Sequence, residues 1–188
     1  MATSSGAYLV PHPMSELWSA IVVRIGLPPA LERVRRQLDR AAGLGVPAHV
    51  TILYPWLPAS ALTDGARAAL DAIAGETRAF DVRFGEARRW PDIVYLEPEP
   101  AAPFSALIER VVARFPDLLP YGGTVQDVIP HLTLVENAYA ALDEIAAQAA
   151  RQLPFDRAIR AIEVLVEGPT GRWQLRWRLP LKDSGVRP

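Results

Sequence analysis

The chain has 188 residues, a length that corresponds to one ordinary domain or to two small lobes around a shared core. Half of the residues are hydrophobic and 22% are charged, as in globular proteins that bury a sizeable interior. The formal net charge of -1 argues against a strong general attraction to nucleic acid or to anionic membrane. Because the chain contains no cysteine, disulfides, thiolate catalysis and cysteine-ligated metal sites are excluded.

The N-terminal residues 1–14 are interpreted as a flexible tail, since serine, glycine and two prolines surround His12. They lack the basic start and the continuous apolar stretch of a signal peptide. The most apolar run nearby, at 20–27, is interrupted by Arg24 and is too short to span a bilayer. We therefore expect a cytoplasmic protein with no membrane partner.

Hydrophobic periodicity and the positions of proline and glycine predict a mixed order of strands and helices. In chain order, we expect a strand at 17–25, a helix at 29–42, a strand at 49–54, a helix at 59–74, strands at 80–84, 86–90 and 93–97, a helix at 104–114, a long loop at 115–130, a strand at 131–136, a helix at 140–152, and a closing hairpin of strands at 159–167 and 173–181. This order is typical of an α+β protein with helices packed outside mainly antiparallel sheet. It predicts a single domain at 15–182, followed by a C-terminal tail at 183–188.

Two matched tetrapeptides are the most informative feature of the sequence: His49-Val50-Thr51-Ile52 and His131-Leu132-Thr133-Leu134. Each closely follows a proline, and residues i and i+2 of a strand point to the same face. Each tetrapeptide therefore places an imidazole and a hydroxyl on one face and two aliphatic side chains on the other. We expect the four polar side chains to face a shared cleft while the aliphatic ones anchor both strands in the core.

This pattern matches the needs of phosphodiester chemistry. Two imidazoles on either side of a phosphate can serve as general base and general acid near neutral pH without a metal. The threonine hydroxyls can hold the non-bridging phosphate oxygens. A lone histidine on an apolar strand is more often structural, and threonine suits strands by its shape alone. The same setting around two of only three histidines favours function, whereas His12 lacks this setting.

The paired motifs resemble those of the two-histidine (2H) phosphoesterase superfamily, which includes 2′-5′ RNA ligase-like proteins and RNA 2′,3′-cyclic phosphodiesterases. The run from His49 to Trp56, Tyr121-Gly-Gly ahead of the second motif, and Gly171-Arg-Trp173 in the closing strand support the resemblance, which covers about 17–181. It implies a bilobal α+β fold in which two mainly antiparallel sheets form a central groove with helices packed outside. It also carries the catalytic assignment onto four residues: His49, Thr51, His131 and Thr133.

The expected activity is that of a metal-independent phosphodiesterase, without a cofactor, that acts on a 2′,3′-cyclic phosphate or a related RNA-type phosphodiester in RNA processing. RNA-handling members often carry a basic residue soon after the second motif, where Val135-Glu136-Asn137 stands here. A small nucleotide, a cyclic phosphate or another phosphodiester metabolite therefore fits as well as an RNA end. No protein partner is implied, and the motifs leave open which histidine is the acid.

Further candidates for substrate contact lie near the motifs. Aromatic rings can stack on a base, with core packing or loop anchoring as the alternative, and the candidates are Tyr54, Trp56, Trp90 and Tyr121. Guanidinium groups match phosphate geometry, although solvation at the surface is the favoured interpretation of each arginine considered: Arg24, Arg88 and Arg89.

Two other hypotheses remain open. The chain could be a nucleotide- or RNA-end-binding module with little or no catalysis, as its near-neutral charge would allow. A metal site could combine both motif histidines with Asp127 or Glu136, but two histidines are too few for a convincing zinc site and the threonines have no role in it.

Overall fold

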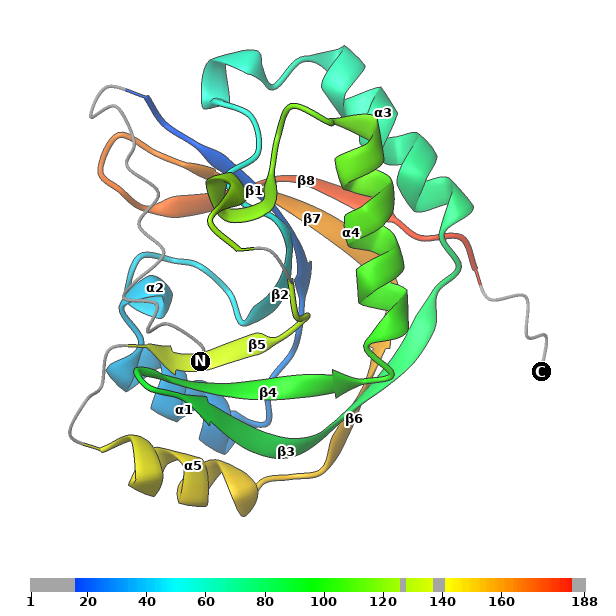
Figure 1. The fold of residues 1–188 in the computed structure, drawn as a ribbon. Coiled ribbons are helices and arrows are strands. Elements are labelled where there is room, and N and C mark those ends of the chain that lie inside the picture. The colour runs from blue at the N-terminus through cyan, green and yellow to red at the C-terminus, as the bar shows by residue number, and fades with distance from the viewer. Residues whose placement is uncertain (1–15, 126–127, 137–140, 184–188) are drawn as a thin grey trace.

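The computed structural model of the chain describes residues 16–125, 128–136 and 141–183 (Figure 1). The strands are β1 Ser19–Arg24, β2 His49–Leu53, β3 Phe80–Trp90, β4 Ile93–Glu99, β5 Leu132–Glu136, β6 Phe155–Ile159, β7 Ala161–Glu167 and β8 Trp173–Pro180. The helices are α1 Pro29–Leu38, α2 Arg40–Gly43, α3 Asp64–Glu76, α4 Ala102–Arg114 and α5 Leu142–Ala150, with 3₁₀ turns η1 Ala59–Ala61 and η2 Pro120–Gly123. The predicted α+β class is confirmed. None of the described helices has the length and apolar character needed to cross a lipid bilayer.

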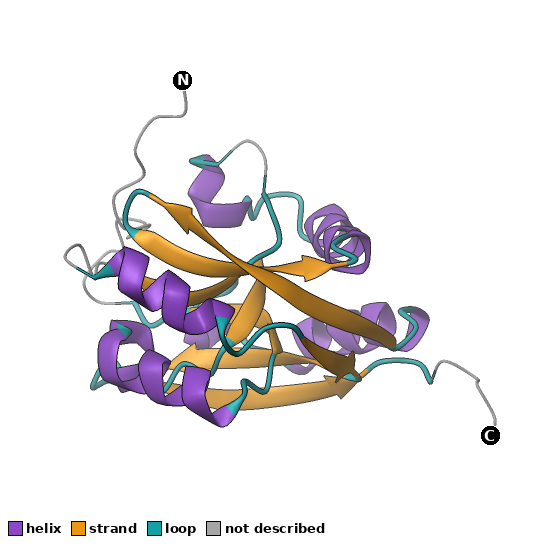
Figure 2. Ribbon diagram, turned by 90° about the horizontal axis from the view of Figure 1, so that it is seen from below, coloured by secondary structure: helices purple, strands orange, loops and turns teal. Residues whose placement is uncertain are grey.

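The strands form one curled antiparallel sheet in the order β6-β3-β4-β5-β2-β1-β7-β8 (Figure 1). Helices lie at its periphery, as the view from below shows (Figure 2). The sheet has two four-stranded halves, β6-β3-β4-β5 and β2-β1-β7-β8, which meet where β2 pairs with β5 through Val50 and Leu132. The two expected sheets are therefore halves of one sheet. They are joined by the short pairing between β2 and β5, the motif strands, which carry the two His-x-Thr tetrapeptides.

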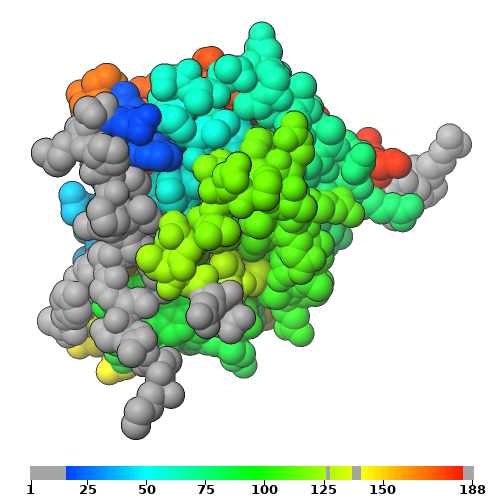
Figure 3. All heavy atoms as spheres, turned by 45° about the horizontal axis from the view of Figure 1, so that its top comes forward, coloured from blue at the N-terminus to red at the C-terminus, as the bar shows by residue number. Residues whose placement is uncertain are grey.

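Helices that cross between the halves tie them together. Helix α1 follows β1 but packs on β5 in the other half, and α4 follows β4 but packs on β2. Helix α5 packs on β3 and β4, whereas α3 packs on β8 and beside α4, with which it covers one face of the molecule (Figure 3). Each half of the sheet is thus partly covered by a helix that follows a strand of the other half. The two halves therefore share one apolar core.

The first expected helix, at 29–42, is broken at Asp39. The backbone of Asp39 is extended, with φ -93° and ψ 119°, and α1 therefore ends there. The Asp39 carboxylate then caps α2 by accepting a hydrogen bond from the N–H of Ala42 at 3.0 Å. A short polar side chain that competes for backbone groups favours such a break. The helix expected from residue 59 begins only at Asp64 for a similar reason, because the side chain of Thr63 caps it.

Two strand predictions were also wrong. The pieces expected at 80–84 and 86–90 form the continuous strand β3, in which an irregularity between Phe84 and Ala87 absorbs the apparent gap. Strand β6 was missed because only its first and last residues, Phe155 and Ile159, are buried, and a short edge strand with a polar middle leaves little hydrophobic pattern. β6 pairs with β3 and completes one half of the sheet.

A buried ion pair at α1 contacts backbone groups near both motif strands. Arg35 and Asp39 lie 3.1 Å apart with side chains that are each 3% exposed. The guanidinium also donates to the carbonyl oxygen of Val46 at 2.8 Å, just before β2. The Asp39 carboxylate accepts from the backbone N–H of Glu136 at the end of β5; burial raises the pKa of Asp39, and Arg35 opposes that rise. One ion pair therefore joins α1 to both motif strands.

Removing the cation of this pair should destabilise the fold. Arg35→Ala leaves Asp39 buried without a partner, and we expect the free energy of unfolding to fall by about 3–5 kcal/mol. The measurement is urea denaturation at pH 7. Arg36→Ala is the matched control, since Arg36 is the exposed neighbour on the same helix and should change stability by no more than about 0.5 kcal/mol. Equal stabilities of the two variants would contradict the structural role assigned to the pair.

Candidate functional site

The motif strands alternate between the core and the opposite side of the sheet. Four aliphatic side chains point into the core and are at most 1% exposed: Val50, Ile52, Leu132 and Leu134. Four polar side chains lie on the other side, here called the motif face, and all are half-buried: His49, Thr51, His131 and Thr133. The period-2 alternation of the two tetrapeptides thus gives the burial pattern expected of it.

The register between β2 and β5 brings the two motifs side by side. Val50 pairs with Leu132 in antiparallel orientation. This register sets His49 across from Thr133 and Thr51 across from His131. Directly opposed residues have Cβ atoms about 4.5–5.5 Å apart and diagonal neighbours about 7–8 Å apart, so the two imidazoles lie on one diagonal of the motif face. The charge of His131 accordingly contributes to lowering the pKa of His49.

Each imidazole is oriented by the same local hydrogen bond. Nδ1 of His49 donates to the carbonyl oxygen of Pro47 at 2.8 Å, and Nδ1 of His131 donates to that of Ile129 at 2.7 Å. A carbonyl oxygen only accepts, so the proton of each neutral ring is assigned to Nδ1 and the lone pair to Nε2. The prolines at or next to the acceptor residues restrict the backbone and help to fix this arrangement. The hydroxyl of Thr51 lies 3.1 Å from Nε2 of His49 and can donate to it.

Burial lowers the pKa of both imidazoles. Desolvation is the largest cause for His49, with the cations of Arg35 and His131 adding to it and the Pro47 carbonyl opposing it, and the pKa falls to about 4. Burial also lowers the pKa of His131 against the opposing hydrogen bond to Ile129. Both rings are therefore neutral at pH 7, and each Nε2 can accept a proton.

Aromatic rings surround His131. Trp90 meets its ring edge-to-face at a centroid distance of 4.7 Å, and Tyr95 does so at 5.7 Å. Trp90 and Tyr95 stack on each other at 4.2 Å, and Tyr95 pairs with Thr133 across β4 and β5. The structure thus places the predicted residue Trp90 at the site. Tyr95 was missed, because its position beside the second motif depends on a strand register that the sequence pattern does not reveal.

Two further aromatic candidates, Tyr54 and Tyr121, lie together at the end of β2. The N–H of Tyr121 donates to the carbonyl oxygen of Tyr54 at 2.7 Å, and Tyr121 adopts a left-handed conformation with φ 52°. The ring of Tyr54 packs edge-to-face on Trp173 at 5.9 Å. Burial, together with the charge of Glu167, raises the pKa of Tyr54 to about 12. These contacts tie the loop that follows α4 to the first motif strand.

Several other candidates have structural partners. Trp56 is fully buried between Phe115 and Trp177, as core packing requires. Arg88 pairs with Glu97 at 2.6 Å, and Arg89 pairs with Asp143. Both arginines therefore have carboxylate partners in the structure, which the sequence did not predict.

The structure gives no support to a metal site among the residues that it describes, where no three histidine, aspartate or glutamate side chains are grouped to hold an ion. Asp127 and His12 lie outside the described residues. Burial, together with Asp39 and Asp92, raises the pKa of Glu136, which makes it a poorer anionic ligand.

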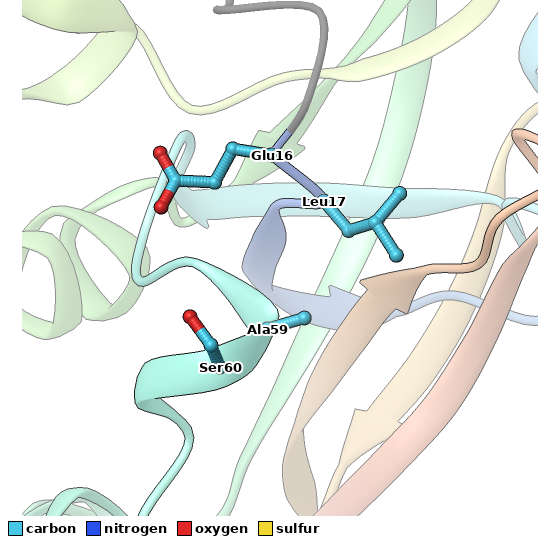
Figure 4. Close-up of a pocket in the computed structure, with 4 residues that line it drawn as sticks. All are labelled: Glu16, Leu17, Ala59 and Ser60. Carbon is cyan, nitrogen blue, oxygen red and sulfur yellow. The ribbon is translucent and has the colours of Figure 1, made fainter.

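A hollow of about 400 Å³ lies where the chain enters β1, between Glu16 and Leu17 on one side and Ala59 and Ser60 on the other (Figure 4). The Leu17 carbonyl accepts the N–H of Ala59 at 2.7 Å, so the hollow lies beside a backbone bridge. Among the described residues, its lining includes none of the four motif side chains and one titratable group, Glu16.

The protonation of the two imidazoles can be followed by NMR. We expect the ring protons of His49 to titrate with a midpoint near 4 and those of His131 below 6.5, with His49→Gln and His131→Gln providing the assignments. The unfolded chain then binds more protons than the folded one, so stability should rise with pH between about 4 and 6.5. A His49 midpoint at or above 6.5 would show that the ring is not buried as described.

Comparison with known proteins places this chain in a family. The family model of the 2′-5′ RNA ligase superfamily matches residues 24–170. No curated protein matches the chain. Among solved structures, the protein TT0787 of Thermus thermophilus is similar, with 19% identity, a TM-score of 0.58, and coverage of 89% of this chain and 99% of that chain.

Escherichia coli LigT has the same fold. Its complex with NADP+ shows 16% identity and a TM-score of 0.55, covering 89% of this chain and 98% of that chain. Its complex with 3′-AMP shows 17% identity and a TM-score of 0.52, covering 89% and 99%. The family match, which spans most of its length, shows that the chain belongs to the 2′-5′ RNA ligase superfamily of two-histidine phosphoesterases, a membership that indicates phosphoesterase-type activity, and the fold agrees with it.

Proposed function

We propose that this protein is a metal-independent phosphodiesterase that opens 2′,3′-cyclic phosphates or cleaves a related RNA-type phosphodiester. The observation that carries the proposal is the pair of neutral imidazoles on one diagonal of the motif face, each with Nδ1 held by a backbone carbonyl. Such a pair leaves two Nε2 atoms on the same face, and a phosphate between them would have a proton acceptor on one side and a proton donor on the other.

In the proposed reaction, water attacks phosphorus and gives its proton to Nε2 of one histidine. The bond from phosphorus to the ribose oxygen breaks, and the second histidine gives its proton to that oxygen. An anionic phosphate raises the pKa of imidazoles beside it, so the bound pair holds the one extra proton that this cycle needs. Proton transfer through water then restores the starting state, and no metal is required.

The surroundings favour different roles for the two rings. His49 lies near the cation of Arg35, which disfavours a second positive charge. His131 lies against the rings of Trp90 and Tyr95, and aromatic rings can stabilise a cation next to them. We therefore assign proton acceptance to His49 and proton donation to His131.

The remaining predicted residues complete the proposed site. Thr51 and Thr133 would donate hydrogen bonds to the non-bridging oxygens, each from the position opposite a histidine. Trp90, Tyr54 and Tyr121 would contact the base or ribose beside the motif face. Complexes of LigT with 3′-AMP and NADP+ support a nucleotide as the substrate class. RNA processing is the proposed setting, because cyclic phosphates form at the ends of cleaved RNA.

A binding module for nucleotides or RNA ends is the second candidate. The formal net charge of -1 and the segment Val135-Glu136 at the end of the second motif favour it, because neither attracts a long RNA. Such a module would bind the product of the proposed reaction but would not turn over the cyclic phosphate.

Turnover of nucleoside 2′,3′-cyclic phosphates in EDTA tests the proposal. We expect activity to persist with the chelator and to fall by about 10²–10⁴-fold in His49→Ala and in His131→Ala, because each removes one proton-transfer group. His12→Ala, which changes the histidine outside the motifs, is the matched control and should retain activity. Loss of turnover with EDTA would contradict the metal-free mechanism. Product binding by calorimetry without any turnover would favour the binding module.

The threonines allow a separate test. Thr51→Val and Thr133→Val keep the side-chain shape but remove the hydroxyl, and we expect each to lower kcat by about 10²–10³-fold, as for other donors to a developing oxyanion. Steady-state kinetics on the same cyclic phosphates measure the effect. Thr170→Val, at an exposed position in the turn before β8, is the control and should behave like the wild type. A wild-type kcat in both motif variants would remove the threonines from the proposed site.

A further inference from the structure

Three arginines converge on a pocket at the end of β1. Arg24, Arg160 and Arg178 line it with Glu163, and its volume is about 280 Å³. Arg24 is the last residue of β1, Arg178 lies on β8, and Arg160 is the single residue between β6 and β7. Since β6 and β7 belong to different halves of the sheet, the pocket lies where the chain crosses from one half to the other.

This pocket continues the motif face. Arg24 pairs with His49 across β1 and β2, and directly opposed residues point to the same side of the sheet. Glu163 pairs with Val22 on one side and with Arg178 on the other, and Val22 in turn pairs with Thr51. With strands about 4.8 Å apart, the pocket extends from roughly 5 Å to roughly 14 Å from β2.

The pocket has a surplus of positive charge. Its lining, as far as the described residues go, holds three guanidinium groups and one carboxylate, that of Glu163, which is 3% exposed. Glu163 lies 3.9 Å from Arg178, and Arg160 lies 3.6 Å from Asp81 outside the lining. Within the described residues, Arg24 is exposed and forms no ion pair. These lining residues therefore carry a net charge of +2, although the formal net charge of the whole chain is -1.

We propose that this pocket binds a second phosphate group of the substrate, adjacent to the phosphate placed between the histidines. The proposal rests on the proposed function, which supplies the first phosphate. Guanidinium groups bind phosphate oxygens in a bidentate manner. The ion pair with the buried Glu163 carboxylate helps to orient Arg178. The preferred substrate is then a cyclic phosphate that carries a further phosphate, either a 5′-phosphate or the next phosphodiester of a short oligonucleotide.

The test compares kcat/KM for three substrates: adenosine 2′,3′-cyclic phosphate, its 5′-phosphorylated form, and a dinucleotide ending in a cyclic phosphate. We expect the wild type to prefer at least one of the two substrates that carry a second phosphate. Arg178→Ala and Arg24→Ala should each reduce that preference by about tenfold, a change that corresponds to about 1.4 kcal/mol. Arg176→Ala is the matched control, because Arg176 lies on the same strand outside the lining and should leave the preference as in the wild type.

Failure of this inference differs from failure of the proposed function. Turnover with no preference for the second phosphate, or a preference that Arg178→Ala and Arg24→Ala both retain, would overturn the inference and leave the phosphodiesterase in place. If no cyclic phosphate is turned over, the proposed function falls, and calorimetry with inorganic triphosphate decides about the pocket. Binding that persists in His49→Ala but weakens about tenfold in both pocket variants would support an anion site. Binding that the pocket variants do not change would overturn it.

Discussion

The pairing of Val50 with Leu132 is the contact on which the candidate site depends. It joins two four-stranded halves into one sheet and sets each motif histidine opposite the threonine of the other motif. Because side chains alternate along a strand, a slip of one residue would turn the histidine and threonine of one motif into the core and expose its aliphatic residues. The four buried aliphatic side chains of the motifs therefore fix the register as well as the fold.

The ion pair of Arg35 and Asp39 supports this junction at an energetic cost. Burying two charges requires desolvation, which their attraction and their hydrogen bonds to backbone groups near both motif strands must offset. The same cation helps to lower the pKa of His49. One group thus contributes to the position of the first motif strand and to the neutral state of its imidazole, so changes in stability and in proton affinity at this site are coupled.

The two motifs are alike in sequence but differ in surroundings. Strand β1 sets the exposed Arg24 beside His49, whereas β4 and β3 bring the rings of Tyr95 and Trp90 to His131. A substrate with a base at one end and phosphates at the other would meet chemically different groups on the two sides of the motif face. This asymmetry underlies the separate roles proposed for the two rings.

The sequence by itself determined the α+β class, most of the helices and strands, and which side chains of each motif share a face, because these follow from local periodicity and from proline positions. The sequence did not reveal the helix break at Asp39 or the edge strand β6, because a local polar cap and a short polar strand leave weak hydrophobic patterns. Only the tertiary structure decided the register of β2 with β5, the place of Tyr95, the contacts of Arg35 and the convergence of Arg24, Arg160 and Arg178. Each depends on segments far apart in the chain, and their spacing in sequence carries no information about how strands align.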